Sequence, residues 1–298
     1  MDFQSLLKTK TEAIEEQIRA LLPQEEGFQK TVISAMNYAV LAGGKRLRPL
    51  FMGEAHGLFQ GNAPMLPHFQ FALECIHTYS LIHDDLPALD NDELRRGKPS
   101  TWKQFGHAMG ILAGDGLLNY AAETASGAFL LCRDHSELVN CARAEQVLFG
   151  KSGIYGMLGG QVLDVEAEGR AVDKEELFFI HANKTAALIE ASLMIGGILA
   201  GADEESVLRL EEAGRNIGLA FQIQDDLLDM TGTEEELGKP IGSDERNGKN
   251  TYVTLFGLER SKEDAEAMLE RAIRLLQGFP VRNVFLEELV RHLIGRRH

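Results

Sequence analysis

Cysteine is scarce in this chain. The three cysteines, Cys75, Cys132 and Cys141, show no metal-ligand spacing, and an odd number leaves no complete disulfide framework. Disulfides are rare in the cytoplasm because thiols are kept reduced there. We therefore interpret the three as reduced thiols and predict a cytoplasmic protein.

Positive charge is scarce relative to negative charge. The 298 residues include 30 Lys and Arg against 45 Asp and Glu, which gives a formal net charge of −15 at pH 7. A phosphate backbone is bound by clustered cations that neutralise it, so this balance argues against a nucleic-acid partner. The same acidity suits multivalent cations.

Long hydrophobic runs are missing as well. The longest uncharged apolar run, Ala191 to Ala202, is too short for a bilayer, which needs about 20 residues. Residues 1–22 alternate charge with Leu and Ile at helical spacing, so we expect no signal peptide. The sequence predicts a soluble protein without membrane insertion.

The alternating pattern of a strand is almost absent. Apolar residues recur three and four positions apart, which is typical of helices. The clearest examples are Phe28–Leu41, Phe69–Ile82, Leu177–Leu199, Val207–Leu228 and Ala265–Leu276. No linker, low-complexity segment or repeat of 20 to 50 residues interrupts them. We predict one all-α domain.

Two aspartate-rich segments each follow an apolar, helix-like run: HDDLPALDNDELRRG, which begins at His83, and FQIQDDLLDMTG, which begins at Phe221. In the second segment Asp225 and Asp229 fall on one helical face, and Gln222 lies one turn before Asp225 and Asp226. We therefore expect these side chains to project together.

The first segment contains a helix end. Pro87 disfavours helix at the residue before it, so the helix should end near Asp85 and Asp90 should return on a loop. Carboxylates at a helix C-terminus meet the negative pole of the helix dipole, which is unfavourable unless cations sit there. Mg²⁺ typically takes one or two protein carboxylates, several waters and phosphate oxygens. Two such segments could clamp a diphosphate through metal bridges, whereas a merely solvated acidic surface explains poorly why both follow apolar helices.

Basic residues accompany the acidic ones. GGKRLRP contains Lys45, Arg46 and Arg48 in a glycine-rich turn, and Arg95 and Arg96 close the first acidic segment. An arginine fork matches phosphate oxygens in bidentate geometry. Alone, either group would be ordinary surface charge, but beside two predicted metal clusters they indicate binding of diphosphate groups.

These motifs resemble those of a known family, the short-chain trans-isoprenyl diphosphate synthases, and within it most closely the bacterial farnesyl type. GGKRLRP is similar to the family's homoallylic diphosphate loop, DDLPALDNDELRRG to its first aspartate-rich motif with the bacterial two-residue insertion, and HANKTAALI to its Lys-Thr motif. FQIQDDLLD resembles the second aspartate-rich motif, and GKPIGSDERNGKNTY the lysine-bearing loop after it. The resemblance implies an all-α fold, a single-domain isoprenoid synthase helical bundle around a deep central cavity. One polyprenyl synthetase domain would span residues 1–298.

The resemblance also implies roles for individual residues. Asp84 and Asp90 would bind two Mg²⁺ ions and Asp225 a third, so three ions are expected per active site. The residues expected to support these ions are Asp85, Asp226, Asp229 and Asp244. Isopentenyl diphosphate would be held by Lys45, Arg48, His77 and Arg96. The allylic diphosphate would be held by Arg95, Lys184, Thr185, Gln222, Lys239 and Lys249. The residues expected to act in catalysis are Asp84, Asp90, Lys184, Thr185, Gln222 and Asp225.

Two further expectations concern product length and assembly. Tyr79 and Ser80 lie five and four positions before Asp84, and the aromatic Tyr79 resembles the floor that ends chain growth in bacterial farnesyl synthases. Ordinary core packing is the alternative interpretation of Tyr79. The resemblance also implies a homodimer.

The implied activity is a prenyltransferase that ionises an allylic diphosphate with the help of Mg²⁺. Isopentenyl diphosphate would condense head-to-tail with dimethylallyl and geranyl diphosphate to give farnesyl diphosphate. A geranylgeranyl or geranyl diphosphate synthase of the same family is the alternative. From other classes, a His-Asp metal phosphohydrolase and a non-catalytic prenyltransferase subunit remain open.

Overall fold

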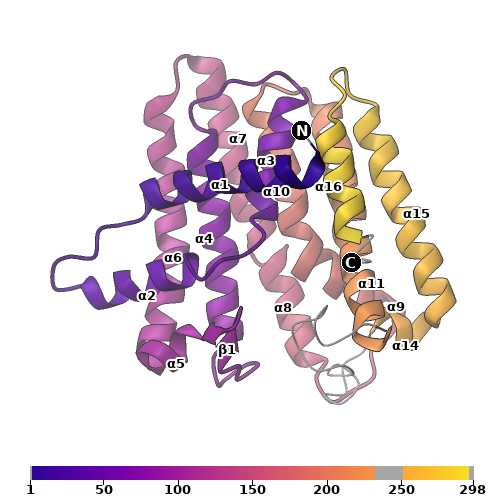
Figure 1. The fold of residues 1–298 in the computed structure, drawn as a ribbon, viewed down its shortest axis with the longest axis horizontal. Helices are drawn as coiled ribbons and strands as arrows, with labels where there is room; N and C mark the ends of the chain where they lie inside the picture. The colour runs from indigo at the N-terminus through magenta and orange to yellow at the C-terminus, as the bar shows by residue number, and fades with distance from the viewer. Residues whose placement is uncertain (1, 232–250, 295–298) are drawn as a thin grey trace. The chain divides into compact units, whose positions relative to one another are not determined.

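The computed structural model describes residues 2–231 and 251–294, and the regular secondary structure of this part of the chain is almost entirely helical (Figure 1). Among these residues the only sheet is a two-stranded antiparallel ladder of β1 (Leu94–Arg95) and β2 (Lys98–Pro99). The predicted all-α fold is confirmed. No helix in the described ranges is long and apolar enough to span a membrane.

The helices form two compact units. The first unit comprises residues 1–53 and 63–145, and the second comprises residues 54–62 and 146–298. Both α3 (Leu47–Gly57) and α7 (His135–Ser152) contribute residues to each unit. That one domain spans residues 1–298 and encloses a central cavity stays a prediction.

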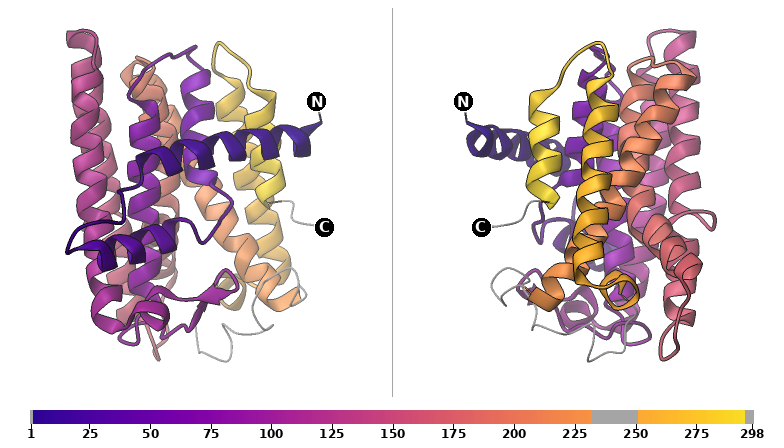
Figure 2. Two further views of the ribbon diagram at one scale, coloured as in Figure 1. Left: turned by 60° about the vertical axis from the view of Figure 1, so that its left-hand side comes forward. Right: turned by 90° about the vertical axis from the view of Figure 1, so that its right-hand side faces the viewer.

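The first unit is built around α4 (Leu66–Asp84). This helix has a proline in its first turn, where no backbone donor is lost, and it is buried on nearly every face. It packs against α6 (His107–Gly127) and α2 (Lys30–Val40), while α1 (Phe3–Leu21) crosses it (Figure 2). The remaining helices of the unit are α5 (Thr101–Phe105) and η1 (Ala128–Leu131).

The second unit is built around α10 (Ala187–Leu199), whose every residue is buried. A helix apolar all round must be surrounded by other helices, as the sequence pattern predicts. Its main partner is the long α11 (Glu204–Thr231), which also packs on α15 (Leu258–Gln277). The other elements are α8 (Met157–Glu166), α9 (Lys174–Ile180), the π-helix η2 (His181–Ala186), α14 (Tyr252–Phe256) and α16 (Val284–Ile294).

Candidate active site

The first aspartate cluster lies at the C-terminal end of α4. The helix ends at Asp84, close to the predicted end, and Asp85 still donates its amide to the Leu81 carbonyl at 3.1 Å. The chain then turns so that the Asp90 amide donates to the Asp84 carbonyl at 2.9 Å. This backbone bond makes neighbours of two aspartates that are six positions apart, as the expected metal pair requires.

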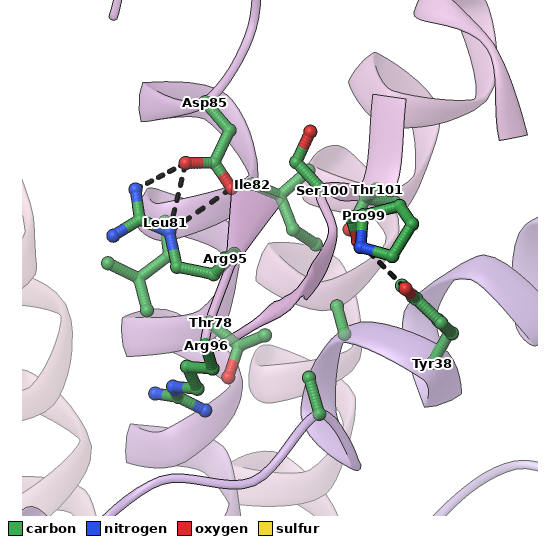
Figure 3. Close-up of a pocket in the computed structure, with 12 residues that line it drawn as sticks. Tyr38, Thr78, Leu81, Ile82, Asp85, Arg95, Arg96, Pro99, Ser100 and Thr101 are labelled. Atoms are coloured by element: carbon green, nitrogen blue, oxygen red, sulfur yellow. Dashed lines mark hydrogen bonds and ion pairs between the residues drawn. The ribbon is translucent and has the colours of Figure 1, made fainter. Parts of the chain in front are cut away.

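Asp85, the residue after Asp84, is bonded to an arginine. Its side chain is buried and accepts hydrogen bonds from the Arg95 guanidinium, with Arg95 Nε at 2.9 Å from Oδ1 (Figure 3). Burial raises the pKa of Asp85, and the bond to Arg95 opposes that rise. Asp85 therefore orients Arg95 in the structure, consistent with a supporting role.

In the turn GGKRLRP, the side chain of Arg46 points into the protein interior. Arg46 is fully buried with a φ of 48°, and its guanidinium reaches three acceptors. Nε donates to Glu15 at 2.6 Å, Nη1 to Glu74 at 2.6 Å, and Nη2 to the Val40 carbonyl at 2.6 Å. Arg46 thus anchors the turn to α1 and α4, and its two basic neighbours remain as the candidates for binding.

Arg96 lies against this turn. A Cβ atom at Gly44 would come within 2.7 Å of Arg96 Nη1, so the guanidinium occupies the space that a side chain at Gly44 would take. Gly44 has a φ of 134°, which also favours glycine. Two segments fifty positions apart in the chain therefore place their positive charges together.

His77 and Arg48 join Lys45 and Arg96 in a group that we call the basic cluster. Loss of water around the ring, and then the charges of Arg48 and Arg96, hold the pKa of His77 well below its usual range. Burial lowers the pKa of Arg48 to about 10, so it stays charged at neutral pH. Arg48 Nε is buried and has no hydrogen-bond partner among the described residues. A neutral imidazole and an unsatisfied guanidinium donor fit a phosphate oxygen.

The second cluster lies in α11. Asp226 is buried and accepts from Gln222 Nε2 at 3.2 Å and from the Tyr252 amide at 2.7 Å. Gln222 in turn accepts from Thr185 Oγ1 at 2.9 Å. The structure therefore brings Thr185 and Gln222 together. Asp225 is half-buried on α11, one position and about 100° of rotation from Asp226.

Lys184 lies in the π-helix η2 and pairs with Asp164 of α8. The two elements approach closely, because a Cβ atom at Gly160 would come within 2.2 Å of the Lys184 amide nitrogen. Sequence analysis missed Asp164. The spacing of the sequence could have indicated it, since Asp164 lies four positions after Gly160 and so on the same helical face.

The two residues expected to limit product length are both on α4. Tyr79 is 8 % exposed, and its ring packs edge-to-face on His83 with centroids 5.8 Å apart. The Ser80 hydroxyl donates back to the His77 carbonyl at 2.9 Å. That either residue limits product length stays a prediction, and of the two side chains Tyr79 is the bulkier.

Other predicted site residues cannot be placed. Lys239, Asp244 and Lys249 lie outside the described residues. Asp84 and Asp90 belong to the first unit and Asp225 to the second, so their sharing of one site stays a prediction. Within the described ranges no group of three or more His, Cys, Asp and Glu is arranged to hold a metal. The pair of Asp84 and Asp90 fits Mg²⁺, which binds through one or two carboxylates when phosphate and water complete its shell.

Comparison with known proteins gives a consistent picture. Residues 29–284 match the polyprenyl synthetase family. The chain is 40% identical over 301 residues to a farnesyl diphosphate synthase of Geobacillus stearothermophilus, covering 100% of this chain and 99% of that one. It is 42% identical to a heterodimeric geranylgeranyl pyrophosphate synthase large subunit 1 of Arabidopsis thaliana, covering 93% and 75%.

A solved structure agrees with these matches. The crystal structure of an FPP/GFPP synthase from Zymomonas mobilis is similar with a TM-score of 0.86 and 34% identity, covering 98% of each chain. Family match, full-length relatives and fold therefore all point the same way. The chain belongs to the polyprenyl synthetase family.

Proposed function

We propose that this polyprenyl synthetase condenses isopentenyl diphosphate head-to-tail with dimethylallyl and then geranyl diphosphate to give farnesyl diphosphate. The observation that carries the proposal is the basic cluster of the first unit. Its unsatisfied Arg48 Nε, neutral His77 and Arg96 packed on Gly44 suit a diphosphate, and the same helix α4 ends in Asp84.

The residues of the basic cluster would hold isopentenyl diphosphate. Lys45, Arg48 and Arg96 supply positive charge, and His77 supplies a hydrogen-bond donor without adding charge. Because the imidazole is uncharged, it does not oppose the guanidiniums beside it. The allylic diphosphate would be held by Arg95, Lys184 and, outside the described residues, Lys239 and Lys249.

Mg²⁺ would be held by carboxylates from both aspartate clusters. Asp84 and Asp90 are proposed to bind two ions and Asp225 a third. When bound, Mg²⁺ supplies positive charge that stabilises the departing diphosphate. Thr185 and Gln222, fixed by their mutual hydrogen bond, would orient their dipoles toward positive charge on the substrate. Apolar α4 side chains such as Ile76 would keep water from that charge.

The farnesyl product is the finer part of the proposal. Relatives named for farnesyl and for geranylgeranyl diphosphate match at similar identity. Tyr79 favours the shorter product because an aromatic ring lies on α4 five positions before Asp84. The helix rises about 5.4 Å per turn, roughly one extended isoprene unit.

The test is incubation of the pure protein with Mg²⁺, isopentenyl diphosphate and dimethylallyl diphosphate, followed by mass analysis of the prenyl alcohols after dephosphorylation. A fifteen-carbon product is expected. A twenty-carbon product would overturn the farnesyl assignment, and absence of any condensation would overturn the prenyltransferase. Release of phosphate without condensation would favour the phosphohydrolase.

A homodimer is also proposed. Helix α6 exposes Ile111 by 48%, Leu112 by 48% and Leu118 by 36%. Such apolar side chains on one helix suit burial against a second copy. The cytoplasmic location inferred from the thiols stays a prediction.

A further inference from the structure

The hairpin of β1 and β2 carries Arg95 and Arg96 but has little structure of its own. The ladder pairs only Leu94 with Pro99 and Arg95 with Lys98. An isolated two-stranded hairpin is at best marginally stable in water. Contacts with other elements must therefore hold the two arginines in place.

One such contact comes from α2. The Tyr38 hydroxyl donates to the Pro99 carbonyl at 2.7 Å, across 61 positions of the chain (Figure 3). The Tyr38 ring also packs edge-to-face on Phe105 of α5, with centroids 5.4 Å apart and planes at 72°. The ring is thus fixed independently of its hydroxyl, which aims the hydroxyl at β2.

A pocket lies behind the hairpin, lined by Tyr38 of α2, by α4 and by the hairpin strands. Two hydroxyl groups face it, Thr78 at 3% and Ser100 at 1% exposure, and neither has a hydrogen-bond partner among the described residues. These hydroxyls do not tie the hairpin to α4. Two bonds hold the hairpin here: the Arg95 guanidinium of β1 bonds to Asp85 of α4, and the Tyr38 hydroxyl of α2 bonds to Pro99 of β2. The bond from Tyr38 is the one that fixes β2.

We propose that Tyr38 is a positioning residue for Arg96. By fixing Pro99 it fixes the register partner Leu94 and, through the short ladder, the turn that places Arg96 against Gly44. The proposal rests on the proposed function, in which Arg96 binds isopentenyl diphosphate. Tyr38 is assigned no contact with substrate in this proposal, because its hydroxyl is engaged with Pro99.

The test compares Tyr38→Phe with a matched control, Tyr120→Phe. Tyr120 makes the same kinds of contact away from the basic cluster: its hydroxyl donates to the Leu21 carbonyl at 3.1 Å, and its ring packs edge-to-face on Phe71 at 6.0 Å. Each variant loses one hydroxyl and keeps its ring, so both should lower Tm by a similar amount.

Only Tyr38→Phe should weaken the binding of isopentenyl diphosphate. We expect its KM and its calorimetric Kd, measured with isopentenyl diphosphate alone, to rise about threefold to tenfold, the range that one hydrogen bond contributes. The value of kcat and the KM of the allylic substrate should change little. Equal KM and Kd in the two variants would leave Tyr38 a structural residue and overturn the proposal.

Arg96→Gln separates this proposal from the proposed function. If Arg96→Gln leaves the Kd of isopentenyl diphosphate unchanged, the role of Arg96 fails, and the Tyr38 proposal fails with it. If Arg96→Gln weakens binding and Tyr38→Phe does not, only the Tyr38 proposal fails. In the double variant, Tyr38→Phe should add nothing to Arg96→Gln, because Tyr38 acts through that arginine. Additive effects would contradict the proposal.

Discussion

At the scale of single residues, Asp84 and Asp90 are joined through their backbones. The bond from the Asp90 amide to the Asp84 carbonyl is made by the backbone, so replacing either carboxylate should leave the turn intact. We expect Asp84→Ala to fold normally and to lose about a thousandfold or more in kcat, since a metal ligand contributes several kcal/mol. Steady-state kinetics beside circular dichroism measures both. Glu12→Ala, at an exposed carboxylate of α1, is the control, and near-normal turnover of Asp84→Ala would refute the metal assignment.

His77 gives a prediction for pH. Its folded-state pKa lies well below the ordinary value because of lost water and nearby guanidiniums. As the pH falls below about 6.5, His77 therefore binds a proton in the unfolded chain before it does so in the folded protein. The free energy of unfolding then falls by at most about 1.4 kcal/mol per pH unit. Urea unfolding at pH 7, 6 and 5 should show a flatter dependence in His77→Gln than in the wild type. The exposed His135→Gln should keep the wild-type slope, and identical slopes in all three proteins would show that His77 is not responsible.

Residue types and spacing alone could identify only part of the site. Thr185 and Gln222 each lie in a recognisable motif, and the structure joins them by a hydrogen bond, while their binding of one substrate stays a prediction. Arg46 and Arg48, by contrast, share the same motif and charge, and only the positive φ of Arg46 and its bonds to Glu15 and the buried Glu74 set it apart. Tyr38 had no signal, because its partner is a backbone carbonyl 61 positions away.

At the scale of elements, α4 is proposed to set the length of the product. Tyr79 is buried five positions before Asp84, and Ile76 lies about one further turn along. We expect Tyr79→Ala to make a twenty-carbon product, because the neighbouring side chains would fill the vacated volume only partly. Product masses from parallel incubations test this. Ser80→Ala should keep the wild-type product, since that hydroxyl bonds within α4, and an unchanged Tyr79→Ala product would mean that the floor lies elsewhere.

The packing of α8 on η2 gives a second element-scale prediction. A methyl group at Gly160 would meet the Lys184 backbone at 2.2 Å, and a backbone cannot move aside as a flexible side chain can. Gly160→Ala should therefore lower the free energy of unfolding by about 1–3 kcal/mol and raise the KM of the allylic substrate. Gly150→Ala in α7 is the control, because nothing lies within 4 Å of its added Cβ. Equal stability of the two variants in denaturant titrations would contradict the close approach.

Element ends differed in how well the sequence predicted them. The end of α4 follows from Pro87, a local cause, and the structure confirms it. The π-helix at His181–Ala186 has no such local cause. Its wider turn depends on neighbours from other helices, since Gly160 and Gly218 each approach its backbone within 3 Å of an added Cβ. Tertiary contacts of this kind leave no periodic pattern in the segment itself.

At the scale of the whole molecule, helical periodicity was sufficient to predict the fold class. The two compact units were not predictable, because no linker or change in composition marks the boundaries near residues 53 and 145. Residues 54–62 belong with the second unit although α3 begins in the first. Chain continuity through a helix hides such a boundary from any pattern of local sequence.

Assembly gives the prediction for the whole molecule. Light scattering at micromolar concentration should find twice the chain mass of 32.9 kDa. Leu112→Glu on α6 should shift the particle toward a single chain, because a buried unpaired charge is costly at an apolar interface. Leu208→Glu, at another exposed leucine on α11, should leave the mass unchanged. A wild-type particle of 32.9 kDa would exclude the homodimer.

The divergence of Arg95 and Arg96 has a consequence for how this chain can vary. The two guanidiniums point apart, one toward Asp85 and the other against Gly44, although the residues are adjacent. In the gene they occupy consecutive codons, and a change in either codon alters one contact while sparing the other. An inserted codon between Leu94 and Arg95 would instead shift both arginines by one place in the ladder and disturb both contacts at once. Point substitutions can therefore tune the two contacts separately, whereas insertions and deletions in this hairpin cannot.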